Sequence, residues 1–152
     1  MNYLITKANK VFLFFVCAFI FSAINISAAF ANTESTTKIQ IPKTISEVWQ
    51  AIDEHEASIE KLIKDNQLAD IHLHAFAIRD LVQALPGLSS DLTPEKLAAV
   101  KRDSSYIGQL AVRLDKTGDA NDKEGTLANF NKLQKILEQI RANYTVTPAK
   151  IN

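Results

Sequence analysis

The sequence predicts an all-α fold: an antiparallel four-helix bundle with up-down-up-down topology that follows an N-terminal signal peptide. Three observations lead to this prediction. Four segments between Thr44 and Tyr144 carry apolar residues at alternating spacings of three and four, the period of one buried helix face. Short connections join these segments, so consecutive helices must fold back on each other. No segment alternates β-branched and polar residues at a period of two, as a half-buried strand would.

Residues 1–31 have the features of a secretory signal peptide. Lys7 and Lys10 provide a basic start, residues 11–23 form an almost unbroken apolar run, and Ala29-Phe30-Ala31 is a small-x-small cleavage signal. Cleavage there exports the mature protein, and its lack of cysteine fits a bacterial periplasm. The alternative is an uncleaved N-terminal membrane anchor, because the apolar run and the residues after it reach the roughly 20 residues that a bilayer span needs.

Removal of the signal peptide changes the composition of the domain. It removes the only cysteine, the only methionine and two of the 17 basic residues, and it removes none of the 17 acidic residues. The mature domain then contains no disulfide, no thiolate nucleophile and no thioether copper(I) site. Because it has no basic excess, we expect no nucleic-acid partner. After cleavage we also expect no stable membrane insertion.

The first helix has clear start and stop signals. Residues 32–43 are polar and rich in Thr and Ser, and we expect a flexible leader there. Thr44 followed by Glu47 forms a capping box, and the helix is expected to run to about Asp65. Asn66 suits the left-handed conformation that ends a helix, and the next helix begins two residues later. The predicted buried face of this first helix contains Ile45, Val48, Ile52, His55, Ile59 and Leu62.

The second helix, predicted from Leu68 to Leu85, has the most regular pattern in the chain and carries two of the three histidines. Pro86-Gly87 is expected to end it, because proline removes a backbone donor and glycine permits a turn. Residues 88–91 are expected to form a linker. The predicted buried face contains Leu68, Ile71, Ala75, Ile78, Val82 and Leu85.

The third helix starts with Thr93 as N-cap and Pro94 at the first helical position. It is expected to end at Gly118. Ser104 and Ala111 are small residues on its buried face, so we expect neighbouring helices to approach it closely.

The fourth helix follows a turn at residues 118–122 and is expected to reach about Tyr144. Residues 145–152 are expected to form a flexible tail. The bundle domain is therefore predicted at residues 44–144. Burial of each large apolar side chain contributes roughly 1.5 to 3 kcal/mol of stability before chain entropy is subtracted. The helix faces carry enough of these side chains that we expect no cofactor to be required for folding.

All three histidines fall in the first helical hairpin, where they predict a metal site. Antiparallel folding places His55 and His74 on facing helices, offset from each other by about one helical turn, roughly 6 Å along the axis. Asp70 lies four residues before His74 and shares its side of the helix, whereas His72 points about 200° away from His74. Imidazole and carboxylate ligands suit zinc, copper(II) or nickel. We therefore expect a site of His55, His74 and Asp70 or a first-helix carboxylate, with His72 as an exposed auxiliary ligand.

Other interpretations of these residues stay open. Histidines without a ligand-spaced motif such as HExxH are common as ordinary hydrogen-bonded side chains. Bis-histidine haem binding through His55 and His74 is another interpretation, in a chain without a CxxCH motif. A metal-free module that docks on an envelope partner is the main alternative function, and it would use Phe76 and Tyr106 on the surface. The chain has no GxSxG elbow, and we expect that it is not an enzyme.

Three stretches resemble one group of proteins: ISEVWQAIDEHEASIEKLI, LADIHLHAFAIRDLVQALP and the segment from LTPEKL to IRANY. The most distinctive parts are HLHAFAIRDL, from His72 to Leu81, and the turn GDANDKEGT. Between about Ile45 and Tyr144 the chain is similar to small exported helical proteins that accompany bacterial heavy-metal efflux systems of the copper, silver and cobalt-zinc-cadmium kinds. The resemblance implies a periplasmic role in metal handling or tolerance, carried by His72 and His74, with an efflux system or another envelope protein as partner.

Overall fold

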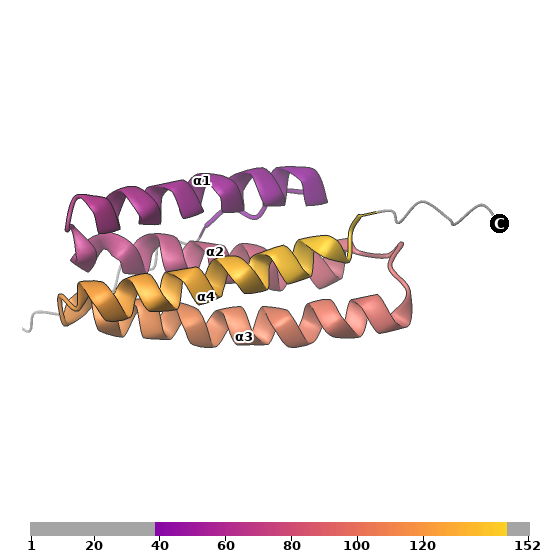
Figure 1. The fold of residues 1–152 in the computed structure, drawn as a ribbon. Coiled ribbons are helices and arrows are strands. Elements are labelled where there is room, and N and C mark those ends of the chain that lie inside the picture. Colours follow the sequence, from indigo (N-terminus) through magenta and orange to yellow (C-terminus); the bar gives the residue numbers. More distant parts are fainter. Residues whose placement is uncertain (1–38, 146–152) are drawn as a thin grey trace, which may run out of the picture. The chain divides into compact units, whose positions relative to one another are not determined.

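The computed structural model describes residues 39–145, and this part of the chain contains four α-helices and no strand (Figure 1). The prediction of an all-α fold is confirmed. The predicted signal peptide, most of the leader and most of the tail lie outside the described residues. The elements are α1 (Ile45–Lys64), the short 3-10 helix η1 (Leu68–Asp70), α2 (Ile71–Leu88), α3 (Pro94–Asp119) and α4 (Lys123–Ala142).

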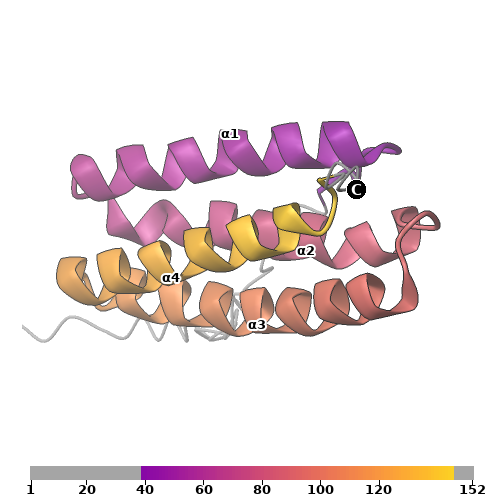
Figure 2. The same ribbon diagram turned by 45° about the vertical axis from the view of Figure 1, so that its right-hand side comes forward.

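Each helix lies beside the one that precedes it and runs in the opposite direction (Figures 1 and 2). α2 packs against α1 and α3, and α3 also packs against α4. The contact between α1 and α4 is the least extensive of these neighbouring pairs. Within the described residues, this is the arrangement that an up-down-up-down bundle requires. None of these helices is both long enough and apolar enough to cross a membrane.

One apolar core runs between the four helices. All six apolar positions predicted for the second helix are buried. The largest side chains that are fully buried are Ile52, Ile59, Leu68, Ile71, Ile78, Leu81, Leu85, Ile107, Leu110, Leu114, Leu133 and Ile140. The leader contributes as well, because Ile39 is half-buried and packs against this core.

The predicted start and stop of the first helix are confirmed. The Thr44 hydroxyl accepts a hydrogen bond from the Glu47 backbone N–H at 3.2 Å, and the Glu47 carboxylate accepts one from the Thr44 backbone N–H at 3.3 Å. This is the reciprocal pairing of a capping box. Asn66 has φ 58°, the left-handed conformation expected of it. The second helix starts later than expected, since residues 68–70 form η1 and α2 begins at Ile71.

α2 does not end before Pro86, as the sequence predicts, but continues through it to Leu88. A proline inside a helix deprives the carbonyl four residues earlier of its donor, and here that carbonyl belongs to Val82. The Ser104 hydroxyl of α3 has one hydrogen, which it shares between Val100 O at 2.7 Å and this oxygen at 3.3 Å. The neighbouring helix thus replaces in part the bond that proline removes.

α3 ends at Asp119, one residue after the expected end at Gly118, and Gly118 itself is buried in the last turn of this helix. A Cβ atom at this position would lie 2.5 Å from the carbonyl oxygen of Leu68. Glycine is therefore needed for the close approach of α3 to η1. The left-handed residue of the turn is Asn121, with φ 52°. α4 then ends at Ala142, slightly before the expected Tyr144.

Candidate functional site

His55 on α1 and His74 on α2 are the two predicted ligands that the fold brings into contact. Their Nδ1 atoms are 2.9 Å apart, and the ring centroids are 5.2 Å apart with an angle of 51° between the planes. His55 lies between Ile52 and Ile59, which are fully buried one turn away on either side. The ring is therefore held at the α1–α2 interface, where it is half-buried.

Both imidazoles are held in their neutral form. Burial lowers the pKa of His55, and the neighbouring His74 lowers it further, against the opposing effect of Glu54. Burial also lowers the pKa of His74, although Asp70 raises it in part. Near pH 7 one ring therefore donates its Nδ1–H to the Nδ1 lone pair of the other, since two neutral imidazoles at this distance need one hydrogen between them. Neutral imidazole is also the form that binds metals.

His72 and Asp70 do not join this pair in the structure. His72 Nδ1 lies 2.7 Å from the carbonyl oxygen of Ala69 and donates to it, so its lone pair is on Nε2. Asp70 is exposed next to the first residue of α2 and acts on His74 electrostatically. Within residues 39–145, no three His, Cys, Asp or Glu side chains are grouped closely enough to hold one ion.

The distance between the two Nδ1 atoms is close to the distance between two nitrogen ligands of one metal ion. With metal–nitrogen bonds of about 2.0 to 2.1 Å, two ligands of a tetrahedral ion are about 3.3 Å apart, and two adjacent ligands of a square-planar ion are about 2.9 Å apart. The observed 2.9 Å matches the second geometry. A haem iron would have to lie between the two rings, so bis-histidine haem binding would require α1 and α2 to separate.

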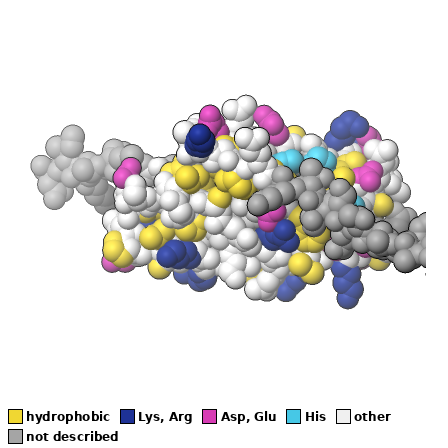
Figure 3. All heavy atoms as spheres, turned by 180° about the vertical axis from the view of Figure 1, so that it is seen from behind, with side chains coloured by type: hydrophobic (Ala, Val, Ile, Leu, Met, Phe, Trp, Pro, Cys, Tyr) yellow, Lys and Arg dark blue, Asp and Glu magenta, His cyan; other side chains and the backbone are white. Residues whose placement is uncertain are grey.

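The surroundings of the pair are partly open. Figure 3 shows histidine side chains at the molecular surface, beside hydrophobic and acidic side chains. Residues 40–43 of the leader and the N-cap Thr44 line a groove along α1 together with Gln50, Ala51 and Glu54, the last of which directly precedes His55 in the sequence. The described part of the leader therefore lies against α1, the helix that carries His55.

A second polar cluster connects α1 and α4. The Arg141 guanidinium lies 4.5 Å from the centre of the Trp49 ring and forms an ion pair with Asp53. Burial, together with the charge of Asp53, raises the pKa of Glu56. The Trp49 Nε1–H is buried and has no hydrogen-bond partner among the described residues. This cluster lies at the contact between α1 and α4, the least extensive of the helix contacts described above. Its partners could not be predicted from the sequence, because Arg141 has no local feature that sets it apart from other surface arginines.

The aromatic residues expected on the surface are not exposed. Phe76 and Tyr106 are half-buried and pack against the core, and the Arg79 guanidinium lies 4.6 Å from the centre of the Phe76 ring. The exposed large hydrophobic side chains in residues 39–145 are Ile41, Leu73, Val112 and Leu127.

Compared with protein-family models, curated proteins and solved structures, the chain matches none of them. The resemblance to exported proteins of heavy-metal efflux systems therefore stays a prediction, and a functional proposal has to be argued from the geometry of the histidine pair.

Proposed function

We propose that this is an exported protein that binds a divalent transition metal ion through Nδ1 of His55 and Nδ1 of His74. The observation that carries the proposal is the 2.9 Å separation of these two atoms across the α1–α2 interface. Water, or a ligand from a partner, completes the coordination. The role that follows is the handling or buffering of zinc, copper(II) or nickel in the periplasm, beside a heavy-metal efflux system or another envelope protein.

The pair is prepared for metal binding in two ways. Two helices hold the rings in place, so little side-chain freedom is lost when an ion binds. Because both rings are neutral near pH 7, no proton has to be released. The ring that donates its Nδ1–H only has to move that hydrogen to Nε2, which makes both Nδ1 lone pairs available.

Copper(II) is the metal we expect to bind most tightly. The affinity of a site with nitrogen ligands is generally higher for copper(II) than for nickel or zinc. The 2.9 Å separation also corresponds to adjacent positions of a square-planar ion, which is a copper(II) preference. A site with only two protein ligands leaves other positions open, and this suits transfer to a partner better than permanent storage.

The first test is calorimetric titration of the metal-stripped protein with copper(II), zinc and nickel near pH 7. We expect about one copper(II) ion per chain with a Kd of about micromolar or tighter, some 8 kcal/mol of binding free energy. His55→Ala and His74→Ala should each abolish this site. His72→Ala is the matched control, because it removes an imidazole from the same hairpin, and it should leave the stoichiometry unchanged.

Binding that persists equally in His55→Ala would refute the proposal. The metal-free alternative, an envelope interaction module, predicts that metal tolerance of the cells does not change in the His55→Ala His74→Ala variant. Bis-histidine haem binding is tested by absorption spectroscopy. Added haem should show the shifted, sharpened Soret band of a bis-histidine complex only if His55 and His74 ligate it, and should otherwise keep the spectrum of free haem.

A further inference from the structure

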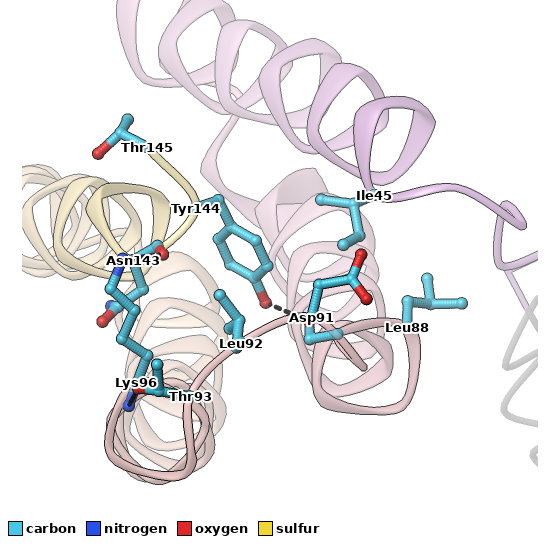
Figure 4. A pocket seen from close by; sticks show the side chains of 10 residues that line it. Ile45, Leu88, Asp91, Leu92, Thr93, Lys96, Asn143, Tyr144 and Thr145 are labelled. Carbon is cyan, nitrogen blue, oxygen red and sulfur yellow. Dashed lines mark hydrogen bonds between the residues drawn. The ribbon is translucent and has the colours of Figure 1, made fainter. Parts of the chain in front are cut away.

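A cavity of about 550 Å³ lies where α1 begins and α2 and α4 end. This volume is in the range of ordinary small-molecule sites, roughly 300 to 1,000 Å³. Its apolar side chains are Ile45 from the first turn of α1, Leu88 from the last turn of α2, and Leu92 from the α2–α3 connection. Tyr144, from the residues just after α4, projects among them (Figure 4). The cavity is thus built from segments far apart in the sequence.

The lining contains one positive and one negative side chain, Lys96 and Asp91. They lie on opposite sides of Tyr144 (Figure 4). The half-buried Lys96 donates one of its three N–H groups to the backbone carbonyl of Asn143 at 3.0 Å, which leaves two donors for other contacts. The Lys96 backbone N–H at the start of α3 already bonds the Thr93 hydroxyl, so the free donors at this end of the cavity are those of the Lys96 ammonium group.

Tyr144 presents an acceptor on the same side as Asp91. Ser89 is buried and donates its only hydroxyl hydrogen to Leu85 O at 2.5 Å. The Ser89–Tyr144 hydrogen bond, 2.8 Å long, must therefore be donated by the Tyr144 hydroxyl. The Tyr144 oxygen keeps lone pairs that can accept a hydrogen bond. One part of the cavity thus offers a carboxylate and a phenol oxygen, and another offers an ammonium group.

We propose that this cavity binds a small zwitterion with an aliphatic side chain, of amino-acid or dipeptide size. Its carboxylate contacts Lys96, its ammonium group contacts Asp91 and the Tyr144 oxygen, and its side chain packs on Ile45, Leu88 and Leu92. Asp91 is exposed and accepts a hydrogen bond from Ser90 at 3.1 Å, and the half-buried Lys96 bonds Asn143, but neither has an opposite charge as partner within the cavity lining. A simple anion would pair only with Lys96, a simple cation only with Asp91, and an uncharged apolar molecule would desolvate the Lys96 ammonium group. The lining is therefore complementary to a ligand that carries both charges.

The single tryptophan allows a direct test. The Trp49 ring lies 6.1 Å from the Tyr144 ring in an edge-on arrangement, so a ligand that contacts Tyr144 changes the environment of Trp49. The probes are L-leucine and L-leucyl-L-leucine, titrated into the purified protein while Trp49 fluorescence is recorded. We expect a saturable change with a Kd of about millimolar or tighter. Leucinamide, which lacks the carboxylate, and 4-methylpentanoate, which lacks the amine, should bind at least about tenfold more weakly.

Matched variants localise the site. Lys96→Met and the isosteric Asp91→Asn should each weaken binding of the better probe about tenfold. Lys101→Met removes an exposed cation from the same helix and should have no effect, and His55→Ala should have none either, which separates this site from the metal site. The proposal is overturned if neither probe gives a saturable change up to about 10 mM. It is also overturned if Lys96→Met and Asp91→Asn both bind as tightly as the native chain, or if the two singly charged analogues match the zwitterion.

Discussion

The hydrogen bond between His55 and His74 holds a single hydrogen between two nitrogen atoms. Taking up one proton leaves a donor and an acceptor, so the contact survives. A second proton leaves two donors facing each other, and the contact is lost. The pair therefore resists full protonation more strongly than either ring would alone, and His74 contributes to the lowered pKa of His55.

This predicts that acid weakens the fold through the histidine pair. The pKa of both rings is lower in the folded protein than the ordinary value near 6.5. As pH falls below about 6.5, the unfolded chain therefore takes up protons first, and the free energy of unfolding decreases until the folded pKa values are passed. In urea unfolding at pH 7 and pH 5, His74→Gln should lose less stability between the two pH values than the native chain.

His72→Gln is the control for this experiment and should behave like the native chain, because the His72 side chain bonds the Ala69 carbonyl and not the pair. Glu56 acts in the opposite direction. Its pKa is raised, so acid stabilises the fold through this group as pH falls through that raised value. Its contribution is the same in all three proteins and cancels in the comparison. An equal loss of stability in the native chain and His74→Gln would contradict the prediction.

At the scale of helices, two sites on α3 control how closely its neighbours pack. Ser104 supplies the bond that Pro86 removes from Val82, and Gly118 admits the backbone of Leu68. Both are small residues, and both act on a helix other than their own. α3 is therefore the element whose exact shape decides where α2 begins and ends.

Ser104→Ala should destabilise the protein by about 1 kcal/mol, because it leaves the buried Val82 carbonyl without a donor. The double variant Ser104→Ala Pro86→Ala restores a backbone N–H at position 86 and should recover most of that loss. Chemical unfolding of the two single variants and the double variant gives the coupling energy. Ser58→Ala is the control, since its hydroxyl also bonds a helix carbonyl but on an exposed surface. Strict additivity of the two substitutions would show that the Ser104 bond does not replace the proline's missing donor.

Gly118→Ala should destabilise the protein by about 1 to 3 kcal/mol, because the new Cβ would lie 2.5 Å from Leu68 O and force the two backbones apart. Gly108→Ala is the matched control on the same helix. There the nearest atom to an added Cβ is 3.7 Å away, on the Gln83 side chain, and alanine should stabilise the helix by up to about 1 kcal/mol. The prediction fails if thermal unfolding shows the same direction of change for both glycines.

At the scale of the whole molecule, the fold and the proposed metal site should be separable. The described helices share a continuous apolar core, and the histidine pair lies at its margin. A strong chelator should therefore leave the helical circular dichroism signal and the unfolding midpoint unchanged. Copper(II) at 100 times its Kd should raise the free energy of unfolding by about 2.7 kcal/mol, and His55→Ala should show no increase. Loss of helical signal on chelation would mean that the metal is part of the fold.

The features that the sequence predicts well are those that depend on neighbouring residues. The Thr44 capping box and the left-handed Asn66 are set within three or four residues, and the periodic apolar faces are set within each helix. The placement of His55 and His74 on facing helices is also predictable, because a short turn leaves an antiparallel hairpin few alternative registers. Their direct contact at 2.9 Å is closer than the predicted offset of one helical turn. Fold class was therefore determined by the sequence alone, and so was the placement of His55 and His74 on neighbouring helices.

Other features depend on atoms that only the tertiary structure brings together. Local rules end α2 at Pro86, and only the Ser104 hydroxyl, 22 residues from Val82, allows it to continue. Local rules make Gly118 a helix end, and only the approach of η1 makes it a packing position. The cavity around Tyr144 has no sequence signature, because separate helix ends and a connection build it. The spacing of apolar residues predicts which face of a helix is buried. It does not predict which hydrogen-bond donor, backbone segment or charged group from a distant part of the chain will contact that face.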